Sequence, residues 1–371
     1  MTELSVQRRI TSLELTEFRN YARFSLEPHE GLTILEGPNG VGKTNIIEAI
    51  GLVTRGESFR TTVWQDLVRW GSDTASVLMA AEDEGGGRTD VALQVAGSRR
   101  TYRVNGTVRR RVSDVMGAVP AVVFTPEDLR IVKDSADRRR GALDSLGGQL
   151  SQSYAATRSE YERIVRQRNA LLRSAEASDQ ELEPWTERLL ETGALLRTLR
   201  VRLLGRLAAD VTEVYSELTG GENLTLVYVD RDEEPSAEQD EFREEDAVVR
   251  MKLAQERRAP EERARGTSLV GPHRDDITFV LEGRDARAFA SQGQQRTIAL
   301  AWKLAEVDSV EKTVQATPVL LLDDVMSELD GSRRQKLAAF VGERTQTFVT
   351  TTNLGYFEAD FVSAAKVVTL Q

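Results

Sequence analysis

The first 55 residues alternate between apolar and polar positions in runs that predict strands, and then follow a helical pattern. ITSLEL, ARFSLEP and GLTILEG, between residues 10 and 36, alternate or form short apolar runs, as strands do. Helical spacing follows at Ile46, Ile47, Ile50 and Val53. Residues 75 to 111 alternate again, and Asn105-Gly106 is typical of a two-residue hairpin turn. The N-terminal third therefore predicts β structure around one helix.

Two long apolar stripes at helical spacing begin near residue 137. The first runs from Asp137 to Arg173, and the second from Trp185 to Leu218, just before Gly220-Gly221. A polar segment ending at Pro184 separates them. Two helices of about 35 residues, each about 50 Å long, predict an antiparallel arm. An ordinary helical bundle is the alternative.

The C-terminal third returns to alternating strands and helices. ENLTLVYVD predicts a strand, and the charged residues 231 to 265 predict one helix between linkers. A helix from Gln292 to about Val310 precedes the strand PVLLLDD, a helix after Gly331 and the strand TQTFVTTTN. We therefore predict an α/β head split into residues 1–136 and 266–371, with a helical arm inserted at 137–265.

Composition narrows the chemistry that this fold can carry. The chain has no cysteine and only two histidines, His29 and His273, which excludes disulfides and argues against a structural zinc site. We find neither a signal peptide nor an apolar run of about 18 residues, so we expect a cytoplasmic protein without a membrane segment. The net charge of −10 argues against a general DNA coat but permits a local basic face.

A glycine-rich loop between a predicted strand and helix has the phosphate-binding pattern G-x-x-x-x-G-K-T. Its backbone N–H groups and the helix N-terminus suit phosphate, Lys43 would reach the β- and γ-phosphates, and Thr44 would ligate Mg²⁺. The alternative is a degenerate loop, although neither Lys43 nor Thr44 is missing. The predicted ATP-binding residues here are Gly37, Pro38, Asn39, Gly40, Val41, Gly42, Lys43 and Thr44.

Two acids end the predicted strand PVLLLDD. Ligands of α/β sheets bind at the C-terminal ends of the strands, so these acids are placed to contact one. Asp323 suits Mg²⁺, and Asp324 suits the polarisation of an attacking water, so we predict that Lys43, Asp323 and Asp324 are catalytic. The alternative is a strand followed by an acidic helix cap.

The sequence SQGQQRT, residues 291–297, has the form of a second anion site. A hydroxyl at a helix N-terminus, with a glycine that allows close approach, suits phosphate. Because the first site already has its own lysine and threonine, we predict that this signature box caps the nucleotide of a second copy; a plain helix cap is the alternative. The box comprises Ser291, Gln292, Gly293, Gln294, Gln295 and Arg296.

Further candidates follow the acids. Asp330 either links two nucleotide sites across a dimer or caps the next helix. Thr351, in a run of three threonines, is a candidate γ-phosphate sensor, with a strand-forming threonine run as the alternative. A DNA-phosphate surface or a solvated hairpin face is predicted at Arg99, Arg100, Arg103, Arg109, Arg110 and Arg111. Arg138, Arg139 and Arg140 form another basic cluster.

Segments along nearly the whole chain resemble the ATP-binding-cassette heads of the SMC and Rad50 class, and within it the RecF family. They are FRNY (18–21), GKTNIIEAI (42–50), SFR (58–60), VVFTPEDL (122–129), RRRGALD (138–144), GPHRDDI (271–277), SQGQQRT (291–297) and LLLDDVMSELD (320–330). The resemblance implies contributions of Arg19 and Asn20 to ATP binding, and an ATP-dependent homodimer with nucleotide sandwiched between the subunits.

The resemblance also implies a weak, DNA-stimulated ATPase that uses ATP and Mg²⁺. Its implied partners are double-stranded DNA, single/double-strand junctions and RecR with RecO, in a nucleoid-associated protein that helps load recombinase. The box departs from the broader pattern with Gln292 in place of glycine, and the second acid, Asp324, is not glutamate. A transporter ATPase subunit and an inactive, structural nucleotide site are the rival interpretations; the long insert disfavours the first.

Overall fold

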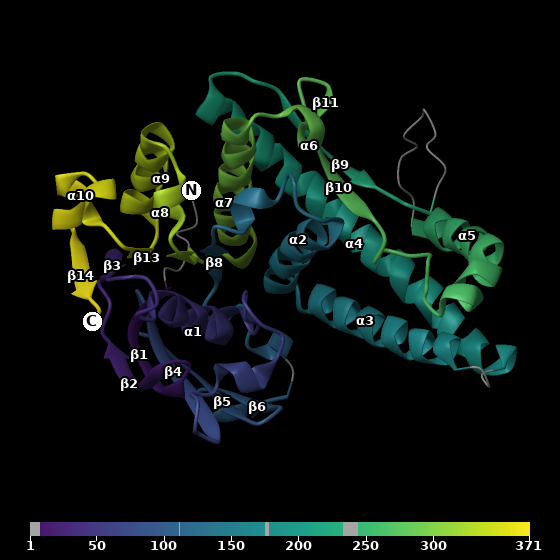
Figure 1. The fold of residues 1–371 in the computed structure, drawn as a ribbon, viewed down its shortest axis with the longest axis horizontal. Coiled ribbons are helices and arrows are strands. Elements are labelled where there is room, and N and C mark those ends of the chain that lie inside the picture. The colour runs from purple at the N-terminus through teal and green to yellow at the C-terminus, as the bar shows by residue number, and fades with distance from the viewer. Residues whose placement is uncertain (1–7, 111, 175–177, 233–243) are drawn as a thin grey trace. The chain divides into compact units, whose positions relative to one another are not determined.

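The computed structural model describes residues 8–110, 112–174, 178–232 and 244–371 (Figure 1). Packing divides the chain into two compact units. The head unit comprises residues 1–130 and 299–371, and the arm unit comprises residues 131–298.

The head unit contains a six-stranded antiparallel sheet in the order β2-β1-β4-β5-β6-β7. Its strands are β1 (Arg8–Phe18), β2 (Tyr21–Leu26), β4 (Thr74–Asp83), β5 (Arg88–Ala96), β6 (Arg99–Val104) and β7 (Thr107–Arg109). Asn105 and Gly106, with φ of 50° and 77°, form the tight turn between β6 and β7, as the sequence predicts.

A five-stranded parallel sheet in the order β14-β3-β13-β12-β8 completes the head unit. Its strands are β3 (Leu32–Glu36), β8 (Ala121–Phe124), β12 (Val319–Leu322), β13 (Thr347–Thr351) and β14 (Ala365–Thr369). All residues of β8, β12 and β13 are buried, as expected for a parallel sheet covered on both faces. Strands from the two ends of the chain thus pair directly, and the sequence pattern did not reveal β14.

Helix α1 (Lys43–Arg55) packs against both sheets of the head unit (Figure 1). Besides the apolar positions that predict it, Ala49 and Leu52 are fully buried, so the helix is enclosed on nearly all sides. It ends at Gly56, whose φ of 72° provides a left-handed C-cap.

Short helices and turns complete the head unit. They are η1 (Trp64–Leu67), η2 (Val112–Asp114), η3 (Asp128–Arg130), α8 (Val325–Glu328), α9 (Gly331–Arg344), η4 (Leu354–Tyr356) and α10 (Ala359–Ser363). Helix α7 (Gln292–Val314) begins in the arm unit and continues into the head unit.

The first predicted arm helix is in fact two helices, α2 (Ala136–Leu150) and α3 (Gln152–Arg173). The break lies at Ser151, which has extended backbone and caps α3 through the N–H of Tyr154. The Tyr154 ring occupies the space beside Gly147, where a Cβ would lie only 2.5 Å from the ring. Gly147 therefore accommodates the tyrosine across the break, and α2 continues through it to Leu150.

The second arm helix, α4 (Asp179–Thr219), begins six residues before the predicted start at Trp185. Ser178 and Glu181 form a reciprocal capping box, and Pro184 is tolerated near the N-terminal end. The predicted end is confirmed, because Gly220 caps the helix with a φ of 80°. Helix α5 (Glu244–Arg265) packs against α3 and α4.

A small antiparallel sheet, β11-β10-β9, also belongs to the arm unit. Its strands are β9 (Leu224–Val229), β10 (Asp276–Leu281) and β11 (Arg284–Asp285), followed by α6 (Ala286–Phe289). Strand β9 packs on α4 and β10 on α2, which is why residues 266–298 group with the arm helices. Packing thus divides the chain at 130/131 and 298/299, whereas the predicted division is at 136/137 and 265/266.

Within the described ranges, no helix combines the length and apolar character needed to cross a membrane.

Candidate functional site

The glycine-rich loop joins β3 to α1 and leaves the N-terminus of α1 open. Gly42 is the N-cap residue, and no side chain among the described residues caps the helix there. Gly42 has a φ of 116°, and a Cβ would lie 2.6 Å from the Tyr21 hydroxyl, so the position requires glycine. The N–H of Gly37 donates to the carbonyl of Thr351 at 3.3 Å, which ties the loop to β13. The loop geometry suits a phosphate group.

Lys43 lies within this loop and is largely buried. Its ammonium donates to the carbonyls of Gly37 (2.7 Å) and Pro38 (2.9 Å). Burial lowers the pKa of Lys43, while Asp324 and Asp323 act to raise it. The lysine is therefore held at the phosphate loop, within the electrostatic influence of the two acids.

Asp323, at the end of β12, is joined to the phosphate loop and to β13 by hydroxyl groups. Thr44 Oγ1 and Thr350 Oγ1 each donate to Asp323 Oδ1 at 2.9 Å. Burial raises the pKa of Asp323, and the two hydroxyls oppose that shift. A threonine hydroxyl beside a buried carboxylate is a donor set that suits Mg²⁺, so the predicted pair, Thr44 and Asp323, is brought together across 279 positions.

Asp324 adopts a left-handed conformation, with a φ of 51°, between β12 and α8. Its N–H donates to Thr350 Oγ1 at 2.8 Å. Its Oδ1 atom is buried and has no hydrogen-bond partner among the described residues. A buried carboxylate oxygen without a partner is costly in a folded chain, and here it fits a site completed by a bound group or water.

The FRNY segment supports the loop from the β1–β2 turn. Asn20 Nδ2 donates to the carbonyl of Val41 at 2.8 Å. Arg19 makes two bonds to Glu48, at 2.8 and 2.6 Å, and Glu48 is fully buried in α1. Asn20 thus contacts the loop directly, while Arg19 reaches it through α1.

Glu48 is a site residue that the sequence reasoning missed. Besides Arg19, it accepts from Ser58 Oγ (2.5 Å) and Arg60 Nη1 (3.3 Å). The available signal was an acid within the apolar stretch IIEAIGLV of α1. The bonds of Glu48 to Arg19, Ser58 and Arg60 connect the FRNY and SFR segments to this helix.

The structure distinguishes Thr350 from Thr351. Thr350 contacts Asp323 and Asp324, whereas the Thr351 hydroxyl donates to the Asn353 carbonyl at 3.0 Å. Thr350 is thus the threonine that contacts the acids, and the sensor role of Thr351 stays a prediction. Asp330 caps α9 by accepting from the N–H of Arg333 at 3.0 Å, as one of its two interpretations predicts.

The signature box lies at the start of α7 and caps it reciprocally. The Gln294 N–H donates to Ser291 Oγ (3.2 Å), and the Ser291 N–H donates to Gln294 Oε1 (3.0 Å). Gln294 also contacts Glu222, and Gln295 donates to the Ala290 carbonyl at 2.7 Å. Ser291 and Gln292 are exposed, and Gly293 and Arg296 are half-buried. Gln294 and Gln295 therefore stabilise the conformation of the box, and Ser291 and Gln292 are exposed on its surface.

The predicted DNA arginines do not form one surface. Residues on paired strands share a face with the residue opposite and alternate along the strand. Arg99 and Arg103 therefore lie on one face of β6, and Arg100 lies on the other with Arg109, which pairs with Tyr102. Arg110 is exposed beyond β7, and Arg111 lies outside the described residues. The five described arginines therefore do not share one face of the sheet, and the prediction of a single phosphate-binding face is wrong for them.

Most of the second arginine cluster is buried. Arg139 binds both carboxylate oxygens of Asp276, at 2.8 and 3.0 Å. Arg140 is buried against Asp137 and the Asp275 carbonyl. These two arginines hold α2 to β10, so a DNA role for them is not supported.

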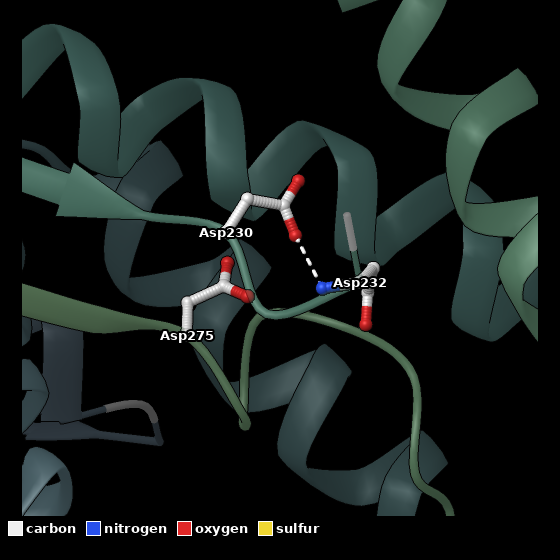
Figure 2. A group of neighbouring side chains, drawn as sticks. All are labelled: Asp230, Asp232 and Asp275. Carbon is white, nitrogen blue, oxygen red and sulfur yellow. Dashed lines mark hydrogen bonds between the residues drawn. The ribbon is translucent and has the colours of Figure 1, made fainter. Parts of the chain in front are cut away.

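Three aspartates of the arm unit, Asp230, Asp232 and Asp275, converge as metal ligands would (Figure 2). Their carboxylate oxygens lie within 4.8 Å of one another. However, the fully buried Arg197 already lies among them, with Asp275 at 2.8 Å and Asp232 at 2.6 Å. A guanidinium supplies the compensating charge, so we assign an ion network and no metal site.

Asp230 differs from Asp232 and Asp275 in its contact with Arg197, although its Oδ1 accepts from the Asp232 N–H at 2.8 Å (Figure 2). Its Oδ2 lies 2.7 Å from Arg197 Nη1, but the two atoms do not meet hydrogen-bond geometry. Burial raises the pKa of Asp230 to about 6, against the opposing effect of Arg197. Charging of this carboxyl therefore destabilises the folded state.

The Asp230→Asn variant should be more stable than the wild type at about pH 8, by about 1–2 kcal/mol. The pKa is higher in the folded state, so the wild type loses stability as the pH rises through about 6, and a neutral amide removes that loss. Because the loss accumulates between the ordinary pKa of 3.8 and the folded-state pKa of about 6, the gain should fall to about half at pH 5, as measured by urea unfolding at both pH values, and should vanish only below about pH 4. Asp275→Asn is the control and should destabilise at both, because it removes a directly bonded partner of Arg197.

Comparisons with known proteins agree with this geometry. Residues 9–369 match the model of the RecF/RecN/SMC N-terminal domain family. The chain is 39% identical to the DNA replication and repair protein RecF of Synechococcus sp., covering 98% of this chain and 96% of that protein. It is 37% identical to the protein of the same name from Geobacillus thermodenitrificans, covering 96% of each.

Two of the solved structures that resemble this chain are also structures of RecF proteins. A structure described as the recombination mediator protein RecF with ATPrS in the RecFOR pathway superimposes with a TM-score of 0.89 at 28% identity, covering 100% of this chain and 98% of that one. Its counterpart with ATP has a TM-score of 0.87 at 29% identity and covers 96% of this chain and 95% of that one. The predicted ATP-binding-cassette head with an inserted helical arm is thereby confirmed.

Proposed function

Because this chain belongs to the RecF/RecN/SMC N-terminal domain family, and within it to RecF, we propose that it is an ATP-dependent DNA-binding protein of recombinational repair and replication-gap processing. It dimerises on ATP and binds double-stranded DNA and single/double-strand junctions. With RecO and RecR it helps load recombinase, and it hydrolyses ATP slowly to reset.

The observation that carries the proposal is the joining of the phosphate loop to the two acids. Thr44 and Thr350 both donate to Asp323, and Thr350 also accepts from the N–H of Asp324. This arrangement connects the parts that bind a nucleoside triphosphate and its metal to the parts that hydrolyse it.

Each residue of the site has a chemical role in this proposal. The loop N–H groups and Lys43 bind the phosphates, and Thr44 and Asp323 hold Mg²⁺, which supplies charge neutralisation when bound. Asp324, through its unpartnered Oδ1, orients a water molecule and accepts its proton. An aspartate in this role, shorter than glutamate, suits slow turnover.

The signature box supplies the dimer contact in this proposal. Ser291 and Gln292 are exposed at the N-terminus of α7, where the helix dipole favours an anion. The γ-phosphate held by the second copy's loop is the anion that fits. Gln294 and Gln295 keep the box in shape through their internal bonds.

Ser291→Asp should abolish ATP-driven dimerisation, whereas Ser291→Asn should largely retain it. Both residues cap helices well, so α7 should begin at the same residue in each variant. Only aspartate places a negative charge where the phosphate would bind. Sedimentation velocity with Mg²⁺ and a non-hydrolysable ATP analogue measures the outcome, with ADP as the reference state.

Equal dimerisation of the two variants would show that the box is only a helix cap. Nucleotide binding by each monomer, followed by a fluorescent analogue, should be unchanged. A wild type that stays monomeric with bound analogue would contradict the proposed dimer itself.

A further inference from the structure

Trp70 is the most exposed large apolar side chain in the part of the chain that the structure describes. It is 97% exposed, compared with 68% for Phe289 and 58% for Val249. It lies in the head unit, between η1 and β4. An indole exposed to this extent leaves its whole aromatic face available for contact with a partner.

The turn that carries Trp70 is firmly held. The Arg69 N–H donates to the Glu17 carbonyl at 2.8 Å, and the Ser72 N–H donates to the Arg69 carbonyl at 3.0 Å. Ser72 Oγ also donates to Glu17 Oε2 at 2.5 Å. Gly71, with a φ of 86°, allows the tight reversal. The indole is therefore displayed from a fixed backbone, which lowers the entropic cost of binding a partner.

The residues around Trp70 are charged or small. Arg69 is 42% exposed and lies 3.3 Å from Glu17, while Ser72 and Asp73 follow the turn. The preceding η1 packs against β5, and the Arg100 guanidinium lies 4.2 Å from the Trp64 ring centre. Protein–protein hot spots usually lie within larger packed apolar patches. A lone aromatic on a fixed turn, with the partly exposed Arg69 next to it in the chain, instead fits nucleic acid.

Helix η1, which directly precedes the Trp70 turn, is connected to the phosphate loop through Arg19 and Asn20. The Arg19 N–H donates to the Leu67 carbonyl, and Arg19 Nη1 donates to the Asp66 carbonyl, both at 2.8 Å. The same guanidinium binds Glu48 of α1, and the neighbouring Asn20 contacts Val41 of the phosphate loop. Arg19 and Asn20, adjacent in the chain, thus tie the phosphate loop and α1 to η1, which directly precedes the turn that carries Trp70.

We propose that Trp70 stacks on an unpaired base at the single-strand side of a DNA junction. Stacking on a planar aromatic tolerates any base, and the neighbouring Arg69 supplies a phosphate contact. Duplex DNA keeps its bases stacked inside the helix, so Trp70 acts on junctions and gaps and not on blunt duplex. The inference rests on the proposed function and names the residue that distinguishes the two DNA forms.

Trp70→Ala should weaken binding to gapped DNA by about 5- to 100-fold and change binding to a blunt duplex by less than about 2-fold. Trp70→Phe should recover most of the loss, because it keeps an aromatic face. Fluorescence anisotropy of labelled DNAs of equal length, with the full chain, Mg²⁺ and a non-hydrolysable ATP analogue, measures both affinities. Circular dichroism confirms that the variants are folded.

Equal weakening on both DNAs, or no change on either, would overturn the stacking role. Loss of ATP-driven dimerisation in Trp70→Ala by sedimentation would overturn it too, and would assign the indole to contact with a second copy. A wild type that binds neither DNA overturns the proposed DNA-binding function, and this inference with it.

Discussion

Replacing Asp324 with asparagine is expected to slow ATP hydrolysis by about 100- to 1,000-fold while ATP-driven dimerisation persists. Asparagine has nearly the same shape and tolerates the left-handed backbone at this position, where φ is 51°. Its backbone N–H can still donate to Thr350. What is lost is the ability to accept a proton from water. Single-turnover phosphate release and sedimentation velocity measure the two properties separately.

Asp323→Asn is the informative comparison, because that residue is assigned to the metal and not to the water. It should impair both properties, since the carboxylate that accepts from Thr44 and Thr350 would be neutral. An Asp324→Asn variant that hydrolyses ATP at the wild-type rate would place the base elsewhere. One that no longer dimerises would show that Asp324 helps to hold the nucleotide.

Arg197→Met should lower the free energy of unfolding of the arm unit by about 3–5 kcal/mol. The side chain is completely buried and compensates Asp230, Asp232 and Asp275. Methionine fills similar space but leaves three carboxylates without their counter-charge. The change should appear as a lower urea midpoint in far-UV circular dichroism, measured near neutral pH without nucleotide.

Arg163→Met is the matched control, since that arginine is 44% exposed and pairs with Glu160 on the surface of α3. We expect it to change stability by less than about 1 kcal/mol. Arg197→Lys, which keeps the charge but loses the two-pronged contact with Asp275, should fall between the two. A change below about 1 kcal/mol in Arg197→Met would contradict the role assigned to the network.

The sequence predicted those parts of the fold whose signal is local. Alternation identified β1, β2 and β4–β7, and Gly220 marked the end of α4. The break at Ser151 was missed because the apolar stripe continues across it, and what favours the break is the packing of Tyr154 against Gly147. Strand β14 was missed because its place depends on pairing with β3, far away in the chain.

The site was predictable where a motif specifies contacts within a few residues. The phosphate loop and the acids could be located in this way. The contact between Thr44 and Asp323 could be expected because both follow strands of one parallel sheet, whose C-terminal ends lie at the same edge. Which of the adjacent threonines faces Asp323 depends on the register of β13, which sequence alone does not define. The arginines failed as a set for a related reason, because strand alternation sends neighbours to opposite faces.

The parallel sheet has a consequence for synthesis on the ribosome. The six-stranded sheet is complete once residue 109 has emerged, but β8, which ends at Phe124, pairs with β12, which begins at Val319. At about 5–20 residues per second, β8 waits roughly 10–40 s for β12, and β3 waits roughly 15–60 s for β13. During that interval the apolar segment AVVF has an unpaired edge. A nascent chain that has not reached β12 should therefore be a chaperone substrate, and chains truncated before Val319 should aggregate.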